Sequence, residues 1–348
     1  MGTLSDYIKW RGDLEFWQDG FNVIDNMVLS CLSYVPLDGV FQKHGAEVID
    51  IQDVNEIYFK DFHDETRYGD NSILRDGPII LKNVADTNRF RHVKIRNYVS
   101  KLELDKTLQF AAMEFLLPDG TSYVAYRGTD DSIVGWKEDF MLALEEVEAE
   151  RQAVAYLNNI ASENDRLLRV GGHSKGGHLA IYATAMCDTG IRERIMNVYS
   201  NDGPGFNQKV AKSMAMKDIC PKIINIVPEE TIVGLLMESV GSAIVVKSTA
   251  IAVAQHSPAT WCIEGKQLVT IDDVSKTARF INRKLKENIY KMSNDELNEF
   301  VENLFSIFES TGAITLSDIK KSGLHGLQVM TKTAGDLTKK IHSNHYTD

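Results

Sequence analysis

Residues 167–185 have the sequence LLRVGGHSKGGHLAIYATA, and this stretch decides the fold. A short apolar run comes first, then a turn that holds Ser174 between Gly172 and Gly176, and then a run of helix-forming and small residues. The turn matches the pattern G-x-S-x-G, in which a strand turns sharply into a helix and holds a serine hydroxyl clear of its own backbone. Glycine suits both flanking positions because it lacks the β-carbon that would collide in so tight a turn. The sequence therefore predicts a buried strand, a turn and a helix, with Ser174 as a candidate nucleophile.

The segments after this turn alternate between apolar strand candidates and helix candidates. The strand candidates are residues 195–200, 222–227 and 243–248, and the helix candidates lie near residues 207–216 and from Ile232 onward. Such alternation is typical of parallel strands joined by crossover helices. We therefore expect an α/β fold with a mainly parallel central sheet.

The chain before the turn begins helical and then becomes rich in strands. Hydrophobic periodicity predicts a helix over residues 22–35, and residues 36–91 are expected to be helical with long connections. The strand candidates are residues 92–99, 109–117 and 122–126, of which the last two form an antiparallel hairpin through the turn at 118–121. Residues 136–150 and 151–160 then have helical patterns.

The C-terminal third has a different character. Residues 275–290, 294–309 and 317–341 have helical patterns, and no linker or repeat separates them from the rest. We expect an α/β-hydrolase domain over residues 1–270 and a C-terminal helical appendage over residues 271–348, packed on the domain or extending from it.

Composition narrows the possible functions. Hydrophobic residues make up 43% of the chain and charged residues 25%, as in an ordinary globular protein. The net charge of −11 argues against a nucleic-acid partner, which would require a basic surface. The four cysteines have neither zinc-site spacing nor the density of a disulfide scaffold, so no metal or other cofactor is expected.

The sequence also predicts a cytoplasmic protein without an integral membrane segment. The N-terminal residues lack the apolar core of a signal peptide. The most apolar stretch, residues 232–254, contains Glu238, Gly241 and Lys247 and is therefore a poor membrane span.

A serine nucleophile needs a base, and few histidines follow Ser174. In the α/β-hydrolase arrangement the acid and then the histidine come later in the chain, each at the carboxyl end of a strand. His178 lies one turn into the following helix, and the last three histidines lie in the polar C-terminal region. His256 follows the final strand candidate at the start of a loop, so we expect His256 to be the base.

Three carboxylates are candidates for the acid that orients this histidine. Asp202 ends the strand after the Ser174 turn, whereas Glu229 and Glu230 end the next strand. The acid usually comes from a later strand than the nucleophile's immediate neighbour, which favours the glutamates. Glu230 is preferred because the turn at Pro228 places Glu229 at its start. Asp202 remains an alternative, although it could instead order the turn at 201–205 by accepting backbone hydrogen bonds.

The oxyanion of an acyl-transfer reaction needs two hydrogen-bond donors. One is expected from the backbone N–H of Lys175, at the start of the helix after the nucleophile. The second is expected from Thr129, whose backbone N–H and hydroxyl follow the strand at 122–126.

These blocks resemble a known family. Residues 127–129 (RGT), 134–140 (VGWKEDF) and 172–177 (GHSKGG) are similar to the layout of fungal-type class 3 lipases. The closer resemblance, over residues 21–261, is to the Mbeg1-like family of bacterial lipase-like α/β-hydrolases. The residues that carry it are 25–34, 127–140, 171–180, 201–206, 228–236 and 255–261.

The resemblance implies an α/β-hydrolase fold with Ser174 as nucleophile, His256 as base, and Thr129 and Lys175 as oxyanion donors. Class 3 lipases have an aspartate where this chain has Glu229 and Glu230. A lysine follows Ser174, and acidic residues are frequent in the region before it. An interfacial lipase would instead be expected to have an exposed apolar lid.

The sequence thus predicts a serine hydrolase that cleaves a small acyl ester or a lipid-like ester through an acyl-enzyme. The alternative is a catalytically weak hydrolase-like scaffold that binds a partner, with residues 275–348 as the interaction surface.

Overall fold

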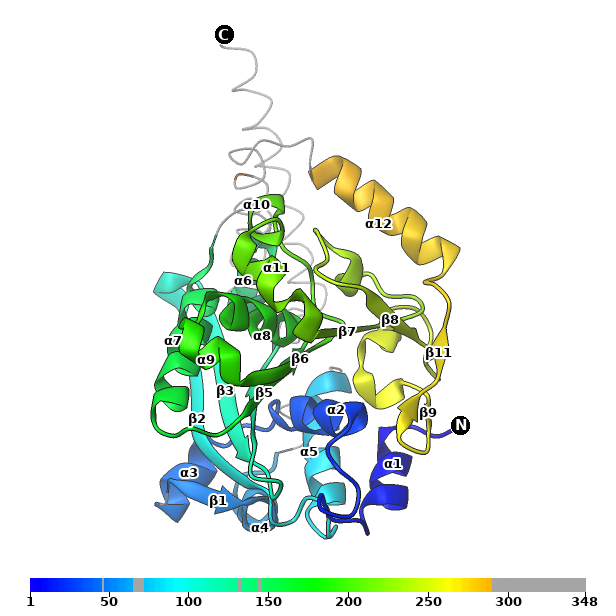
Figure 1. Ribbon diagram of the computed structural model, residues 1–348. Coiled ribbons are helices and arrows are strands. Elements are labelled where there is room, and N and C mark those ends of the chain that lie inside the picture. Colours follow the sequence, from blue (N-terminus) through cyan, green and yellow to red (C-terminus); the bar gives the residue numbers. More distant parts are fainter. Residues whose placement is uncertain (46, 65–71, 131–132, 143–145, 290–298, 300–348) are drawn as a thin grey trace, which may run out of the picture.

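A nine-stranded sheet forms the centre of the computed structural model, which describes residues 1–45, 47–64, 72–130, 133–142, 146–289 and 299 (Figure 1). The order of its strands is β1-β2-β3-β4-β5-β6-β7-β8-β11. Their bounds are β1 Val48–Asp50, β2 Lys94–Glu103, β3 Leu108–Leu116, β4 Ser122–Tyr126, β5 Leu168–His173, β6 Ile195–Asn201, β7 Ile223–Pro228, β8 Ala243–Val246 and β11 Thr270–Ile271. Strands β9 (Ile263–Glu264) and β10 (Gln267–Leu268) pair separately.

The five strands from β4 to β8 run parallel to one another. The other neighbours in the sheet pair antiparallel, including β3 and β4, where Met113 faces Ala125. The predicted α/β-hydrolase fold with a parallel central sheet is therefore confirmed, and so is the predicted hairpin that leads into it. Parallel strands end at one edge of the sheet, so the segments that follow β4, β5, β6 and β7 meet there.

Helices flank the sheet on both faces (Figure 1). Their bounds are α1 Leu4–Arg11, α2 Val23–Leu32, α3 Asp38–His44, α4 Ile51–Asp61, α5 Ser72–Val84, α6 Ile133–Met141, α7 Glu148–Ser162, α8 Lys175–Met186, α9 Thr189–Arg194, α10 Gln208–Ala211, α11 Met214–Ile219 and α12 Lys276–Ile289. The helix expected over residues 22–35 is α2, which begins at the capping residue Asn22.

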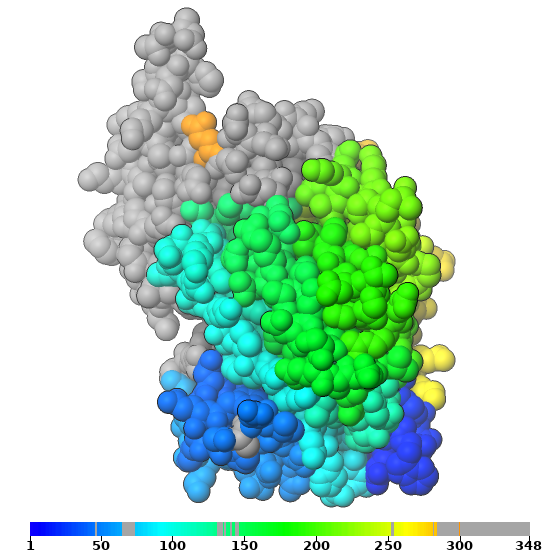
Figure 2. All heavy atoms as spheres, turned by 60° about the vertical axis from the view of Figure 1, so that its left-hand side comes forward, coloured from blue at the N-terminus to red at the C-terminus, as the bar shows by residue number. Residues whose placement is uncertain are grey.

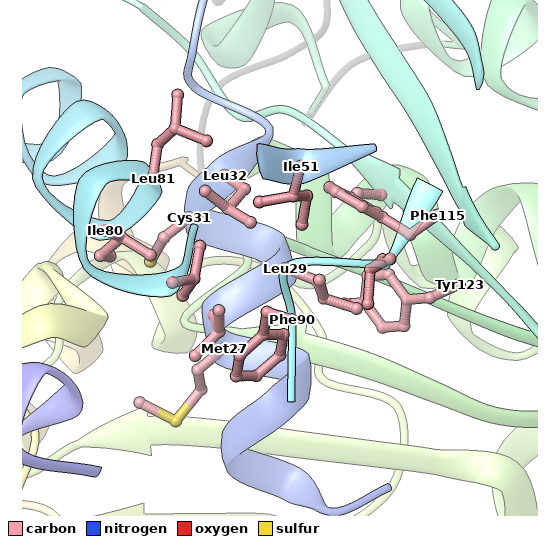
Figure 3. Close-up of a cluster of buried hydrophobic side chains, with 14 of the residues drawn as sticks. Met27, Leu29, Cys31, Leu32, Ile51, Ile80, Leu81, Phe90, Phe115 and Tyr123 are labelled. Atoms are coloured by element: carbon pink, nitrogen blue, oxygen red, sulfur yellow. The ribbon is translucent and has the colours of Figure 1, made fainter. Parts of the chain in front are cut away.

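Two hydrophobic cores lie on opposite faces of the sheet. Along β4, Tyr123 and Ala125 belong to one core, and Val124 and Tyr126 belong to the other, because successive side chains of a strand point to opposite faces. The first core packs the sheet against helices of the N-terminal third, with α2 at its centre (Figure 3). The second core packs the sheet against α7, α8 and α11. Strand β5, before Ser174, thus lies between two packed layers, and helix α8, after it, belongs to the second.

Several segments differ from the sequence prediction. The helix expected over residues 136–150 is divided into α6 and α7. The helix expected from Ile232 is only a 3-10 turn, Val233–Leu235, in which the Leu235 and Leu236 N–H groups donate to the carbonyl oxygens three residues earlier. Strand β1, within the stretch expected to be helical, was not predicted, nor were the short strands β9 to β11.

The region beyond residue 270 begins with one confirmed helix. Helix α12 agrees with the prediction for residues 275–290. The helices predicted over residues 294–309 and 317–341 lie outside the described residues, and the appendage over residues 271–348 stays a prediction. On the face drawn in Figure 2, the blue N-terminal side chains lie along the lower part, and the green side chains from the middle of the chain lie above them.

Candidate active site

Ser174 stands at a strained turn between β5 and α8. Its backbone angles are φ 56° and ψ −132°, a region that residues with a side chain rarely adopt. A β-carbon on Gly172 would lie against the Gly176 backbone, and one on Gly176 would lie against the Tyr126 carbonyl oxygen. The predicted need for glycine on both sides of Ser174 is confirmed. The turn is the one that the pattern G-x-S-x-G predicts.

Asp202 and His256 form a hydrogen-bonded pair close to this turn. The Nδ1 of His256 lies 2.7 Å from Oδ2 of Asp202, whose side chain is 1% exposed. Donation from Nδ1–H to the carboxylate leaves Nε2 as the unprotonated nitrogen of a neutral imidazole. Because 21% of the His256 side chain is exposed, this imidazole can meet a molecule arriving from solvent.

Two further donors fix the Asp202 carboxylate. The Thr231 hydroxyl and the Gly234 backbone N–H both donate to Oδ1, the latter at 3.1 Å. Asp202 itself has a positive φ of 52°, immediately after β6. Its backbone N–H donates to the Ile226 carbonyl oxygen of the neighbouring strand at 2.7 Å. Asp202 is therefore held by strand β6 and by strand β7 with the segment that follows it.

The sequence preference for Glu230 as the partner of His256 requires a correction. The Nδ1 partner is Asp202, which the sequence retained only as an alternative. The Glu230 backbone N–H donates to Oε1 of Gln255, at 3.0 Å, and the Glu229 backbone N–H donates to the Val246 carbonyl oxygen. The sequence argument failed because the positive φ of Asp202 directs its carboxylate toward the base, which strand order alone does not reveal.

Backbone contacts bring the Asp202–His256 pair next to Ser174. The Ser174 N–H donates to the carbonyl oxygen of Asn201, the residue before Asp202, at 3.0 Å. On the other side, the ring of His173 lies 4.5 Å, centroid to centroid, from the ring of His256. Asn201, next to Asp202, and His173, next to Ser174, thus make the contacts between these segments. The structure thus places Ser174, Asp202 and His256 in neighbouring segments.

The Thr129 hydroxyl is engaged by a carboxylate. Its Oγ1 donates to Oδ2 of Asp139 in α6, so the hydroxyl is not directed at an oxyanion while this bond is present. Burial raises the pKa of Asp139, opposed by the nearby Lys175 ammonium and by the Thr129 hydroxyl. Of the two groups that the sequence offered at Thr129, the backbone N–H is the one left for an oxyanion.

Lys175 directs its side chain into the protein. Its Nζ lies 2.9 Å from Glu138 Oε2, 3.0 Å from the Gln109 carbonyl oxygen and 3.6 Å from Asp139 Oδ1, and the side chain is 1% exposed. The ammonium is therefore withdrawn from solvent, which the position of the lysine next to Ser174 did not predict. The backbone N–H of Lys175 begins α8, and the first N–H groups of a helix have no partner within it.

Several residues of the site were not given a role from the sequence. His173, Tyr34, Thr231 and the pair of Glu138 and Asp139 all contact the segments described above. Each lies far from its partner along the chain, so no short motif contains both. His173 is part of the G-x-S-x-G stretch and could have been singled out from it.

No cluster of three or more His, Cys, Asp or Glu side chains suited to a metal ion occurs among the described residues. Within the same part of the chain, every helix is too short or too polar to cross a lipid bilayer.

Comparison with solved structures finds proteins of distantly similar structure, lipases among them. A fungal lipase in complex with an inhibitor is 17% identical, with a TM-score of 0.39 over 64% of this chain and 77% of the lipase chain. A Penicillium cyclopium protein, MDLA, is 13% identical, with a TM-score of 0.39 over 71% of this chain and 83% of the other. The M37 lipase is 14% identical, with a TM-score of 0.37 over 62% and 69% of the two chains.

No curated protein matches the sequence. A family model does match it, and that model is the Mbeg1-like one, over residues 84–306. The match includes the segments that carry Ser174, Asp202 and His256. Because it spans well over half of the 348 residues, the chain belongs to the Mbeg1-like family.

Proposed function

We propose that the protein is a serine hydrolase that cleaves an acyl ester through a triad of Ser174, His256 and Asp202. The single observation that carries the proposal is the 2.7 Å hydrogen bond between His256 and Asp202 beside a serine with φ 56°. A structural turn has no need of a strained serine, and strain of this kind, on the order of 1–3 kcal/mol, is typical of active sites.

The order of the reaction steps follows from which atoms of Ser174 and His256 hold protons at the start. Ser174 Oγ attacks the acyl carbonyl carbon while its proton passes to Nε2 of His256. Asp202 accepts the Nδ1–H bond and stabilises the imidazolium that forms. His256 then protonates the leaving alcohol, and an acyl ester of Ser174 remains. Water attacks this ester with His256 again as base, which releases the carboxylic acid and restores the serine.

The oxyanion is bound by backbone N–H groups. The donors are those of Lys175, at the start of α8, and of Thr129, with the Thr129 hydroxyl retained by Asp139. The helix dipole of α8 adds positive potential at the same place. Loss of one such donor costs about 3–4 kcal/mol of transition-state stabilisation, so both positions matter for rate.

A small acyl ester or lipid-like ester fits this chemistry, and the reaction requires no cofactor. We retain a cytoplasmic location as a prediction. The acidic composition, with a net charge of −11, gives no support to a nucleic-acid substrate.

The direct test is covalent labelling with a fluorophosphonate probe, which reacts with activated serines. Labelling is expected in the parent, abolished in Ser174→Ala and strongly reduced in His256→Ala. The control is Ser162→Ala, since the Ser162 side chain is exposed and its hydroxyl contacts only the local Asn159 carbonyl oxygen among the bonds described. An unlabelled parent, or labelling that survives Ser174→Ala, favours the binding-scaffold alternative and overturns the proposal.

A further inference from the structure

His173, the residue before the candidate nucleophile, is connected to the loop of the base. Its side chain is fully buried, and its Nε2 lies 2.8 Å from the backbone carbonyl oxygen of His256. A carbonyl oxygen only accepts hydrogen bonds, so Nε2 carries the proton and donates it. We propose that this bond makes His173 the positioning residue that holds the base loop over Ser174. The proposal rests on the proposed function, because His256 matters as a base only in that reaction.

The other ring nitrogen connects His173 to the oxyanion loop. Burial, reinforced by the nearby His256, keeps the pKa of His173 well below its ordinary value, so the ring is neutral and Nδ1 is an acceptor. The Tyr34 hydroxyl of the N-terminal region lies 2.9 Å from Nδ1 and donates to it. The same hydroxyl packs against Gly128, where an added β-carbon would collide with it and lie 3.0 Å from Ser174 Cβ.

One buried imidazole therefore touches three parts of the site. It belongs to the nucleophile turn, it binds the base loop directly, and through Tyr34 it contacts the residue before Thr129. Both ring nitrogens are used in one tautomer, so the ring has a single orientation in which all these contacts are made. This is the arrangement expected of a group that fixes the distances between segments remote in sequence.

His256 depends on the hydrogen bond from His173 more than Gln255 and Ser257 do. Its imidazole is held by Asp202 and its backbone by His173. The residues on either side have other anchors: the Ser257 hydroxyl donates to Asp76, and the Gln255 carbonyl oxygen accepts from the Trp261 indole at 2.8 Å. Loss of the His173 bond is therefore expected to displace His256 while the surrounding loop stays folded.

Two substitutions separate the two nitrogens of His173. In His173→Gln, the amide NH2 occupies roughly the position of Nε2 and can still donate to the His256 carbonyl. In His173→Asn, the shorter amide occupies roughly the position of Nδ1, so Tyr34 keeps an acceptor but the base loop loses its donor. The two variants are similar in polarity and differ in which bond they retain.

The measurements are the rate of fluorophosphonate labelling and the proton NMR signal of the His256 Nδ1–H. A proton shared between a histidine and a carboxylate resonates at unusually low field, and His256→Ala identifies the signal in the parent. We expect His173→Asn to label on the order of tenfold more slowly or worse and to lose or broaden the low-field signal. His173→Gln is expected to recover most of the rate and the signal.

The outcomes distinguish this inference from the proposed function. If the parent is labelled and His173→Asn matches it in rate and signal, the positioning role is wrong while the enzyme stands. If both variants lose the signal equally, with melting temperatures close to that of the parent, the hydrogen bond donated to the His256 carbonyl does not position His256. The inference is then overturned. If the parent is not labelled but only His173→Asn loses the signal, the hydrolase proposal fails and the structural role of His173 is supported.

Discussion

The Lys175 ammonium lies 2.9 Å from the Glu138 carboxylate, and both side chains are 1% exposed. Glu138 also accepts from the backbone N–H groups of Gln109 and Ala149, each at 3.1 Å, so it joins the starts of β3 and α7. The residue that follows the nucleophile is therefore tied through its side chain to two distant elements. This buried pair supports the backbone N–H that is proposed to bind the oxyanion.

Removing one partner of this pair should destabilise the fold strongly. Lys175→Met leaves the Glu138 charge buried without its cation, and such a change typically costs about 3–5 kcal/mol. The free energy of unfolding from guanidinium titration measures the loss. Arg151→Ala is the matched control, since the Arg151 and Glu148 side chains are 52% and 26% exposed and an exposed pair contributes about 1 kcal/mol or less.

A double variant tests whether the cost arises from the unpaired charge. Lys175→Met combined with Glu138→Leu removes both charges, and we expect it to be more stable than Lys175→Met alone. A double variant that is less stable than the single one would instead assign the cost to the hydrogen bonds that Glu138 accepts from Gln109 and Ala149.

The identity of the acid can be decided by two isosteric substitutions. Asp202→Asn removes the charge beside His256 and allows the wrong imidazole tautomer, which is expected to reduce kcat on a short-chain ester by about 10⁴-fold. Glu230→Gln is expected to reduce kcat less than about threefold, because the Nδ1 of His256 is bonded to Asp202. The reverse order would restore Glu230 as the acid.

The contrast between these two residues shows what the sequence could provide. The strand, turn and helix around Ser174 were predictable because glycine spacing and apolar periodicity are local properties. His256 could be named as a candidate because few histidines follow the serine in a suitable loop, and its role as base stays a proposal. Asp202 was misjudged because its role depends on a positive φ and on donors from Thr231 and Gly234, which only tertiary packing brings together. The burial of the Lys175 side chain could not be predicted for the same reason, because its partner Glu138 lies 37 residues earlier.

Gly234 offers a test of how firmly the acid must be held. A β-carbon at this position would collide with Asp202 Oδ1 and lie 2.6 Å from Val227 Cγ1, so Gly234→Ala should displace the carboxylate from His256. We expect kcat to fall more than tenfold with KM nearly unchanged, and stability to fall by about 1–3 kcal/mol. The measurements are steady-state hydrolysis of a short-chain ester and denaturant unfolding.

The matched control for this substitution is Gly190→Ala. Gly190 lies in α9, and a β-carbon there would meet no atom within 4 Å. Alanine in a helix is more stable than glycine by about 0.5–1 kcal/mol, so this variant should be as stable as the parent or slightly more stable. If Gly234→Ala hydrolyses the ester at the parent rate, then the contact between Gly234 and Asp202 is not needed to hold the acid.

His173 should also make stability depend on pH. Burial first, and the neighbouring His256 second, lower its pKa well below the ordinary value of 6.5, so the folded protein keeps this ring neutral when the unfolded chain takes up a proton. The unfolded state then binds more protons, and the free energy of unfolding falls as pH decreases below about 6.5, by at most about 1.4 kcal/mol per pH unit from this group. Above that pH both states hold the ring neutral, and the effect disappears.

Denaturant unfolding between pH 7.5 and pH 5 measures this dependence. His173→Gln cannot take up the proton, so its free energy of unfolding should fall less steeply than that of the parent, while the other histidines contribute equally to both curves. The control is His44→Gln, because the His44 side chain is exposed to water in the folded protein and should give a curve parallel to that of the parent. Equal slopes for His173→Gln and the parent would mean that His173 takes up its proton in the folded state, and the neutral ring that donates to His256 and accepts from Tyr34 would then be the wrong description.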